Sequence, residues 1–214
     1  KEQFDAIDPQ NVNHLLGLFN PSHMQYAFDT PNDPGGEPSL SEMTAKAIEL
    51  LSQNDEGYYL NVEAGRIDHA HHAVNPFRAL NDTIELANAV KTATEMVDLN
   101  DTLIIVTADH SHVFTIAGYP KRGNPILGKV VGLDNAGNPR DEPSIARDGM
   151  PYTTLGYANG RGHAELPNRN TADAIYTVPI QENRRNDLSD VDTTHEGFHS
   201  ESLIPLSDET HGGE

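Results

Sequence analysis

Two histidine-rich segments, each directly after an apolar run, most constrain how this chain can fold. They are V-E-A-G-R-I-D-H-A-H-H at residues 62–72 and T-A-D-H-S-H at residues 107–112, and together they hold five of the eleven histidines. Each apolar run is predicted to form a strand, and open α/β sheets bind ligands beyond the carboxyl ends of their strands. The two segments therefore predict a metal site at one edge of a sheet.

The residue types and their spacing suit divalent cations. Asp68 and His72 are four residues apart, so one face of a helical turn would carry both side chains. Asp109 and His110 follow the second apolar run, where the chain leaves the sheet, and Glu63 holds the same position after the first. Imidazole with carboxylate favours zinc, whereas an all-oxygen position such as Glu63 favours magnesium. Because the chain has no cysteine, a thiolate site is excluded.

The chain is strongly acidic, with 33 acidic and 14 basic side chains and a formal net charge of −19. This excess argues against nucleic acid as a partner and against a basic membrane-surface role. It fits either plain acidic solubility or a salt-adapted source. An anionic substrate would need local positive charge, which metal ions would supply. No run reaches the roughly 20 apolar residues of a membrane span.

Two helices are predicted from their starting signals. Ser39 and Glu42 form a capping box of the S-x-x-E type, and apolar residues repeat at helical spacing after it. Asn75 followed by Pro76 predicts an N-cap with proline at the first helical position, opening a helix that continues to about residue 97.

Strands are predicted on both sides of the second helix, at residues 58–62 and 101–107, so the three elements would form a right-handed crossover. Weaker strand candidates lie at residues 14–19, 113–117 and 151–157. Residues 161–202 are polar, and we interpret them as an inserted surface region between an α/β core at 1–160 and a return to that core at 203–214.

The motifs, taken together, resemble the alkaline phosphatase family, and its animal-type branch in particular. The resemblance rests on residues 62–72 and 107–119, on R-G-N at 122–124, on Y-T-T-L-G-Y-A-N-G at 152–160 and on E-T-H-G-G-E at 209–214, which come in the family's order. It implies a three-layer α/β/α sandwich, incomplete in this chain, with residues 161–202 as a crown-like surface region. It also implies an exported homodimeric enzyme, periplasmic or extracellular.

The resemblance implies a site with two zinc ions and one magnesium ion that hydrolyses phosphate monoesters through a phosphoserine and releases inorganic phosphate. By motif, Asp68, His72 and His211 correspond to ligands of the first zinc. Asp109 and His110 correspond to ligands of the second zinc.

Three further positions are implied by the same motifs. Glu63 corresponds to the magnesium ligand, and His112 to a histidine behind the ligands of the first zinc. His69 corresponds to a position beside the phosphate pocket.

An additional calcium site of the animal-type branch is implied by G-L-F-N-P and E-P-S-L. Phe19 would offer its carbonyl and Glu37 its carboxylate, while Asn20 stands where relatives have an acid. A fourth ligand would lie outside this sequence.

The family's nucleophilic serine, its bridging aspartate and its phosphate-binding arginine have no match before residue 62. We therefore expect this sequence to be a C-terminal portion that is inactive alone and that associates with the missing N-terminal half. Two alternatives stay open. One is another enzyme of the same metal-dependent superfamily, such as a phosphodiesterase, a sulfatase or a phosphoglycerate mutase. The other is a non-catalytic metal-binding domain.

Overall fold

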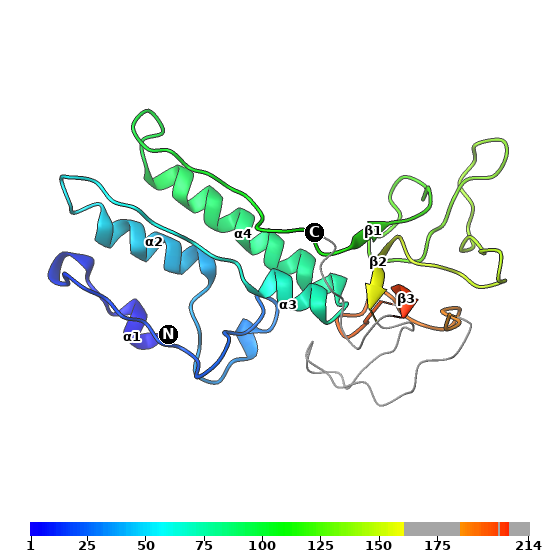
Figure 1. The fold of residues 1–214 in the computed structure, drawn as a ribbon, viewed down its shortest axis with the longest axis horizontal. Coiled ribbons are helices and arrows are strands. Elements are labelled where there is room, and N and C mark those ends of the chain that lie inside the picture. The colour runs from blue at the N-terminus through cyan, green and yellow to red at the C-terminus, as the bar shows by residue number, and fades with distance from the viewer. Residues whose placement is uncertain (161–184, 201, 206–214) are drawn as a thin grey trace. The chain divides into compact units, whose positions relative to one another are not determined.

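The computed structural model describes residues 1–160, 185–200 and 202–205. Short helical turns, longer helices and three strands follow one another along this part of the chain (Figure 1): α1 (Glu2–Asp5), η1 (Pro9–Asn11), η2 (Thr30–Asn32), α2 (Leu40–Leu51), α3 (Arg66–His72), α4 (Pro76–Met96), β1 (Phe114–Ile116), β2 (Leu155–Gly160) and β3 (Ser202–Pro205). The content is thus mixed α/β, and none of the helices described here is both long and apolar enough to cross a bilayer.

The described residues fall into two compact units. The first comprises residues 1–67 and 80–107, and the second comprises residues 68–79 and 108–214. Helices α3 and α4 each contribute residues to both units. The units are therefore described one at a time.

Helix α2 lies in the first unit and starts as the capping box predicts. The Ser39 hydroxyl accepts a hydrogen bond from the Glu42 backbone N–H at 3.2 Å, and the Glu42 carboxylate accepts one from the Ser39 N–H at 2.8 Å. Glu85 of α4 accepts hydrogen bonds from the backbone N–H and the hydroxyl of Ser41, at 2.9 and 2.7 Å. Buried Ile48 points to the interior of this unit.

Helix α4 also confirms its predicted start. Asn75 precedes the helix, and its side-chain oxygen accepts a hydrogen bond from the Arg78 backbone N–H at 3.0 Å. Pro76 occupies the first helical position, where no backbone N–H is required. The helix ends at Met96, one residue before the predicted end.

The strands predicted at residues 14–19, 58–62 and 101–107 are not formed in the described part of the chain. These residues have no regular secondary structure and pair with no strand, so the predicted crossover around α4 is absent from the described residues. Their apolar side chains are largely exposed, as at Tyr59 (86 %) and Leu103 (82 %). An apolar run specifies a buried strand only where neighbouring strands supply hydrogen-bond partners, and the described residues supply none.

The sheet that does form belongs to the second unit and has the strand order β1-β2-β3. Strand β1 pairs antiparallel with β2, and β2 pairs parallel with β3, so that Tyr157 lies opposite both Phe114 and Ser202. The strand predicted at 113–117 is confirmed, whereas the one predicted at 151–157 begins later, at Leu155. The three-layer sandwich stays a prediction.

The described part of the predicted insertion contributes to the interior of the second unit. Leu188 and Phe198 pack against each other and are buried. The Lys129 ammonium donates hydrogen bonds to three backbone carbonyls of this segment, those of Leu188, Ser189 and Val191, at 2.7 to 3.1 Å. The limits of the insertion and its crown-like role stay predictions, because residues 161–184 lie outside the described ranges.

Helix α3 ends in a Schellman motif that carries valine at the position where glycine is usual. The Asn75 N–H donates to the Ala70 carbonyl and the Val74 N–H donates to the His71 carbonyl, each at 2.9 Å. Val74 has a φ of 50° and a fully buried side chain. A left-handed backbone costs a non-glycine residue roughly 1–2 kcal/mol. Burial of the Val74 side chain offsets this backbone strain.

Replacing Val74 by glycine is therefore expected to be less destabilising than replacing it by alanine, by about 1 kcal/mol. Both variants lose the buried side chain, but only glycine also removes the backbone strain. Chemical denaturation of the two variants measures the difference. Ala93→Gly in α4 is the matched control, and it should show the usual order, with glycine costing about 0.5–1 kcal/mol relative to alanine. If Val74→Gly is no more stable than Val74→Ala, the backbone at Val74 is not strained.

Candidate metal centre

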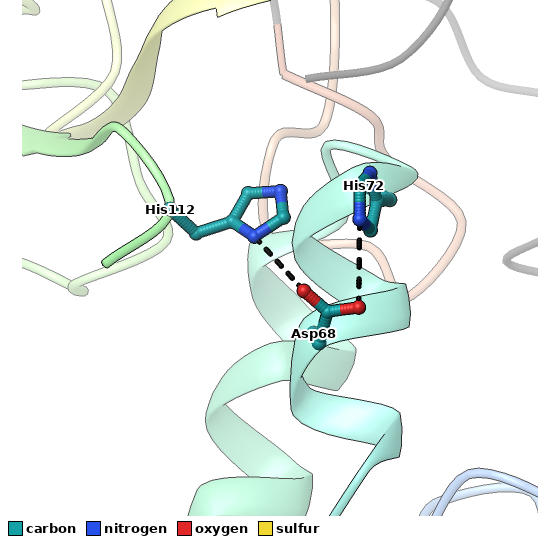
Figure 2. Close-up of side chains that lie close together, drawn as sticks. All are labelled: Asp68, His72 and His112. Carbon is teal, nitrogen blue, oxygen red and sulfur yellow. Dashed lines mark ion pairs between the residues drawn. The ribbon is translucent and has the colours of Figure 1, made fainter. Parts of the chain in front are cut away.

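Helix α3 presents a carboxylate and an imidazole on one face, as their spacing predicts. The last turn brings Asp68 Oδ2 to 3.4 Å from His72 Nε2. Both side chains are partly buried in the second unit. Figure 2 shows the Asp68 carboxylate lying between His72 and a second imidazole, that of His112.

His112 reaches the same carboxylate from the segment before β1. Its Nδ1 lies 3.2 Å from Asp68 Oδ1, so His72 and His112 approach different oxygens of Asp68. Val113, between His112 and β1, has a φ of 47° and redirects the chain into the strand. Asp68, His72 and His112 offer ligand atoms that all lie within 4.8 Å of one another, and they are the one such group among the described residues.

His110 lies at the margin of this cluster. Its Nε2 is 3.7 Å from Asp68 Oδ1 and also 3.7 Å from Asp109 Oδ2, and its Nδ1 lies 2.6 Å from the Ser111 carbonyl. The Asp109 side chain is 90 % exposed. The second predicted pair is thus adjacent to the first, with a largely solvated carboxylate.

The cluster suits a zinc ion by geometry and by donor type. Two ligands held about 2.0–2.1 Å from a tetrahedral zinc lie about 3.4 Å apart, which matches the Asp68–His72 separation. Asp68 Oδ1 is buried and accepts no hydrogen bond from the described residues. A buried carboxylate oxygen facing ring nitrogens is favourable when a cation supplies the missing positive charge.

Burial lowers the pKa of two histidine rings in and beside the cluster, those of His112 and His71. Burial, and secondarily the neighbouring His72, lowers the pKa of His112, and the nearby Asp68 carboxylate opposes this shift. Burial lowers the pKa of His71 to about 4, with His112 the next contribution. A neutral imidazole is the form that binds metal, so the lowered pKa of His112 favours the form that a metal site requires.

A group of aromatic rings behind His112 was missed by the sequence reasoning. His71 Nδ1 lies 2.9 Å from the Tyr157 hydroxyl, and the His71 ring stacks on His112 with centroids 5.5 Å apart. Phe114 of β1 contacts both His71 and Tyr157. One local signal was available, since His71 is three residues after Asp68 and helical spacing puts it on the same side of α3.

The remaining predicted site residues are not brought into this cluster by the described geometry. Glu63 belongs to the first unit, so its part in the same centre stays a prediction. His69 lies on α3 with its side chain partly buried, and its position beside a phosphate pocket also stays a prediction. His211 lies outside the described residues.

The predicted calcium residues lie in the first unit, where Glu37 is only 5 % exposed. One Glu37 oxygen accepts a hydrogen bond from the Asn20 amide at 3.1 Å, and the other accepts one from the Gln25 N–H at 2.6 Å. The Asn20 oxygen accepts from the Ser22 N–H at 3.2 Å, which leaves the amide nitrogen facing Glu37. Asn20 therefore presents a donor where a calcium ion would need an oxygen, and calcium binding with Phe19 stays a prediction.

Asn20→Asp is expected to make stability depend on calcium. Without calcium, the variant loses a hydrogen bond to a charged group, worth about 1.5–3 kcal/mol, and places two carboxylates together. Calcium at a hundred times its dissociation constant would return about 2.7 kcal/mol. Thermal unfolding with calcium or with a chelator measures both changes. Asn13→Asp, at an exposed position, is the control, and a calcium response no larger in Asn20→Asp than in the control would refute the expectation.

The chain has the mixed α/β content and the imidazole–carboxylate cluster of a candidate metal-binding protein. The family model described as alkaline phosphatase matches residues 1–214. The chain belongs to the alkaline phosphatase family.

Several vertebrate enzymes are similar to the chain along nearly all of its length. The tissue-nonspecific isozyme of alkaline phosphatase from Homo sapiens is 39 % identical over 209 residues, which cover 98 % of this chain and 34 % of that protein. The same isozyme from Gallus gallus is 40 % identical, with 98 % and 35 % covered. An alkaline phosphatase from Gadus morhua is 36 % identical over 214 residues, with 100 % and 39 % covered. The chain thus spans little more than a third of the length of these relatives.

Proposed function

We propose that the protein containing this chain is a metal-dependent phosphatase that hydrolyses phosphate monoesters. The single observation that carries the proposal is the convergence of Asp68, His72 and His112 within 4.8 Å, in a chain that belongs to the alkaline phosphatase family. Bound metal ions would also allow a phosphate anion to bind. A chain of net charge −19 repels such an anion unless cations offset the charge locally.

Asp68 and His72 would hold a first zinc ion together with His211. His112 would contact Oδ1 of Asp68 and so orient the carboxylate, with Oδ2 facing His72. Asp109 and His110 would hold a second zinc ion, and Glu63 a magnesium ion.

When bound, such a pair of metal ions stabilises the attacking and leaving oxygens of a phosphoryl transfer. The residues of this chain contribute by placing ligands and by burying the Oδ1 atom of Asp68. Burial lowers the pKa of His112, which favours the neutral ring over a positive charge that would repel a metal ion. We infer that a serine outside this sequence acts as the nucleophile, since no segment before residue 62 resembles the family's nucleophile motif.

The same family membership supports further proposals about the whole protein. We infer a homodimer that is exported to the periplasm or the extracellular space, with residues 161–202 as a crown-like region. Inorganic phosphate would be both the product and a ligand of the site.

The proposal is tested by comparing hydrolysis of p-nitrophenyl phosphate with hydrolysis of bis(p-nitrophenyl) phosphate. The protein is stripped with a chelator and reloaded with zinc and magnesium. A phosphomonoesterase hydrolyses the monoester much faster, loses this activity on chelation and regains it on reloading. A preference for the diester would indicate another enzyme of the superfamily instead. Tight zinc binding without hydrolysis of either ester would indicate a non-catalytic metal-binding protein.

A further inference from the structure

The most informative contact outside the candidate ligands joins helix α3 to strand β2. His71 Nδ1 lies 2.9 Å from the Tyr157 hydroxyl, although the two residues are 86 positions apart in the sequence. Tyr157 is 1 % exposed and occupies the central strand of the sheet. A buried tyrosine hydroxyl requires a hydrogen-bond partner, and a histidine ring nitrogen supplies one in either tautomer.

The His71 ring is also a support for His112. The two rings are nearly parallel, at 20°, with centroids 5.5 Å apart. The His72 ring also approaches His112, edge-on, with centroids 4.4 Å apart and an interplanar angle of 83°. Two neighbouring rings thus restrict the orientation of the His112 ring.

Phe114 completes the support from strand β1. Its ring centroid lies 4.8 Å from that of His71 and 5.2 Å from that of Tyr157. Aromatic rings at these distances pack favourably, and a closed group of them leaves little freedom to any single ring. Phe114 and Tyr157 of the sheet therefore contact His71, and His71 in turn contacts His112.

We propose that His71 and Tyr157 are positioning residues, whose hydrogen bond fixes the ring on which His112 stacks and so keeps His112 Nδ1 against Asp68 Oδ1. The proposal depends on one part of the proposed function, namely that Asp68 is a metal ligand. Partners of this kind, which orient ligands without touching the metal, change metal affinity by about 10–100-fold when they are lost. Because His71 and Tyr157 act through His112, we expect their loss to change metal affinity by an amount at the lower end of that range.

The alternative is that the Tyr157–His71 hydrogen bond only stabilises the interior of the second unit. That role predicts a change in unfolding temperature and none in the metal site. The positioning role predicts a change at the metal itself, so the two roles separate in measurements of metal binding.

The test compares Tyr157→Phe with Tyr152→Phe, the same substitution five residues earlier on the same segment, in the purified protein. Tyr157→Phe keeps the ring and removes the hydroxyl. Zinc affinity is measured by competition with a chromophoric chelator, and the visible spectrum is recorded after cobalt substitution. We expect zinc affinity about tenfold lower and an altered cobalt spectrum for Tyr157→Phe, and neither change for Tyr152→Phe.

A second variant, His71→Asn, keeps a polar atom near the Tyr157 hydroxyl but removes the stacked ring. It should also lower zinc affinity and alter the cobalt spectrum if the ring supports His112. Wild-type zinc affinity and an unchanged cobalt spectrum in both folded variants would overturn the proposal. It would also be overturned if the wild-type protein bound neither metal. A wild-type protein that binds zinc but hydrolyses no ester would overturn the proposed function and leave the positioning role standing.

Discussion

Replacing Asp68 by asparagine is expected to have the largest effect of any single substitution on metal binding and on hydrolysis. The Asp68 carboxylate faces three imidazoles, with His112 Nδ1 at 3.2 Å, His72 Nε2 at 3.4 Å and His110 Nε2 at 3.7 Å. Asparagine has the same shape but removes the negative charge and turns one oxygen into an N–H donor. The variant then keeps the three imidazoles and loses the carboxylate that they face.

The expected size follows from the role proposed for the metal ion. Loss of a ligand should exceed the 10–100-fold effect of losing an orienting partner, so zinc affinity should fall by more than about 100-fold. If metal ions supply several kcal/mol of charge stabilisation in the transition state, monoester hydrolysis should fall by about 1,000-fold. Metal content per chain and the rate on p-nitrophenyl phosphate measure the two effects.

Asp55→Asn is the matched control, because Asp55 is an exposed aspartate that lies outside both histidine-rich segments. It should retain zinc and activity. High zinc concentrations should restore part of the activity of Asp68→Asn if weakened binding is the cause. An Asp68→Asn protein that retains zinc and full activity would show that the cluster is not the metal centre.

The parts of the fold that the sequence predicts correctly are those with local signals. The start of α2 follows from Ser39 and Glu42, which are three residues apart, and the start of α4 from Asn75 and Pro76. The Asp68–His72 contact likewise needs only one turn of helix. Each of these features forms from a few consecutive residues and requires nothing from distant parts of the chain.

The strands are predicted less well because a strand is stabilised by its neighbours. The runs at 58–62 and 101–107 have the composition of buried parallel strands, yet their side chains are exposed and the described residues offer no ladder beside them. Leu155–Gly160 became a strand because Phe114–Ile116 and Ser202–Pro205 flank it. Composition states what a segment can form, and pairing decides whether it forms.

The same limit applies to the candidate site. The sequence indicated Asp68, His72 and His112 as neighbours of a metal ion, but it assigned His71 no role at the site. The contact that gives His71 its place comes from Tyr157, which lies 86 residues further along the chain. A hydrogen bond at that separation depends on how the sheet and α3 pack, which spacing along the chain does not specify.

Replacing Arg78 by methionine is expected to produce the largest loss of stability. Arg78 is 1 % exposed in the first turn of α4, and its guanidinium donates to the Glu196 carbonyl at 2.5 Å. The Asn75 amide donates to the same carbonyl at 3.0 Å. Two further hydrogen bonds hold the segment after Glu196 to the turn between α3 and α4: His199 Nδ1 lies 2.5 Å from the Ala73 carbonyl, and the Ser200 N–H donates to the Val74 carbonyl at 2.8 Å.

Arg78→Met keeps most of the side-chain volume and removes the charged donor from a buried position. Hydrogen bonds to charged groups are worth about 1.5–3 kcal/mol, and the Glu196 carbonyl keeps only its bond from the Asn75 amide, so the free energy of unfolding should fall by about 1.5–3 kcal/mol. Arg122→Met, at an exposed arginine, is the control and should change it by less than about 0.5 kcal/mol. Denaturant unfolding measures both, and equal stabilities of the two variants would mean that Arg78 does not fasten residues 196–200 to the turn after α3. Because that turn directly follows His72, the Arg78 variant should also release zinc more readily than the control, which links the stability of this segment to the retention of the metal.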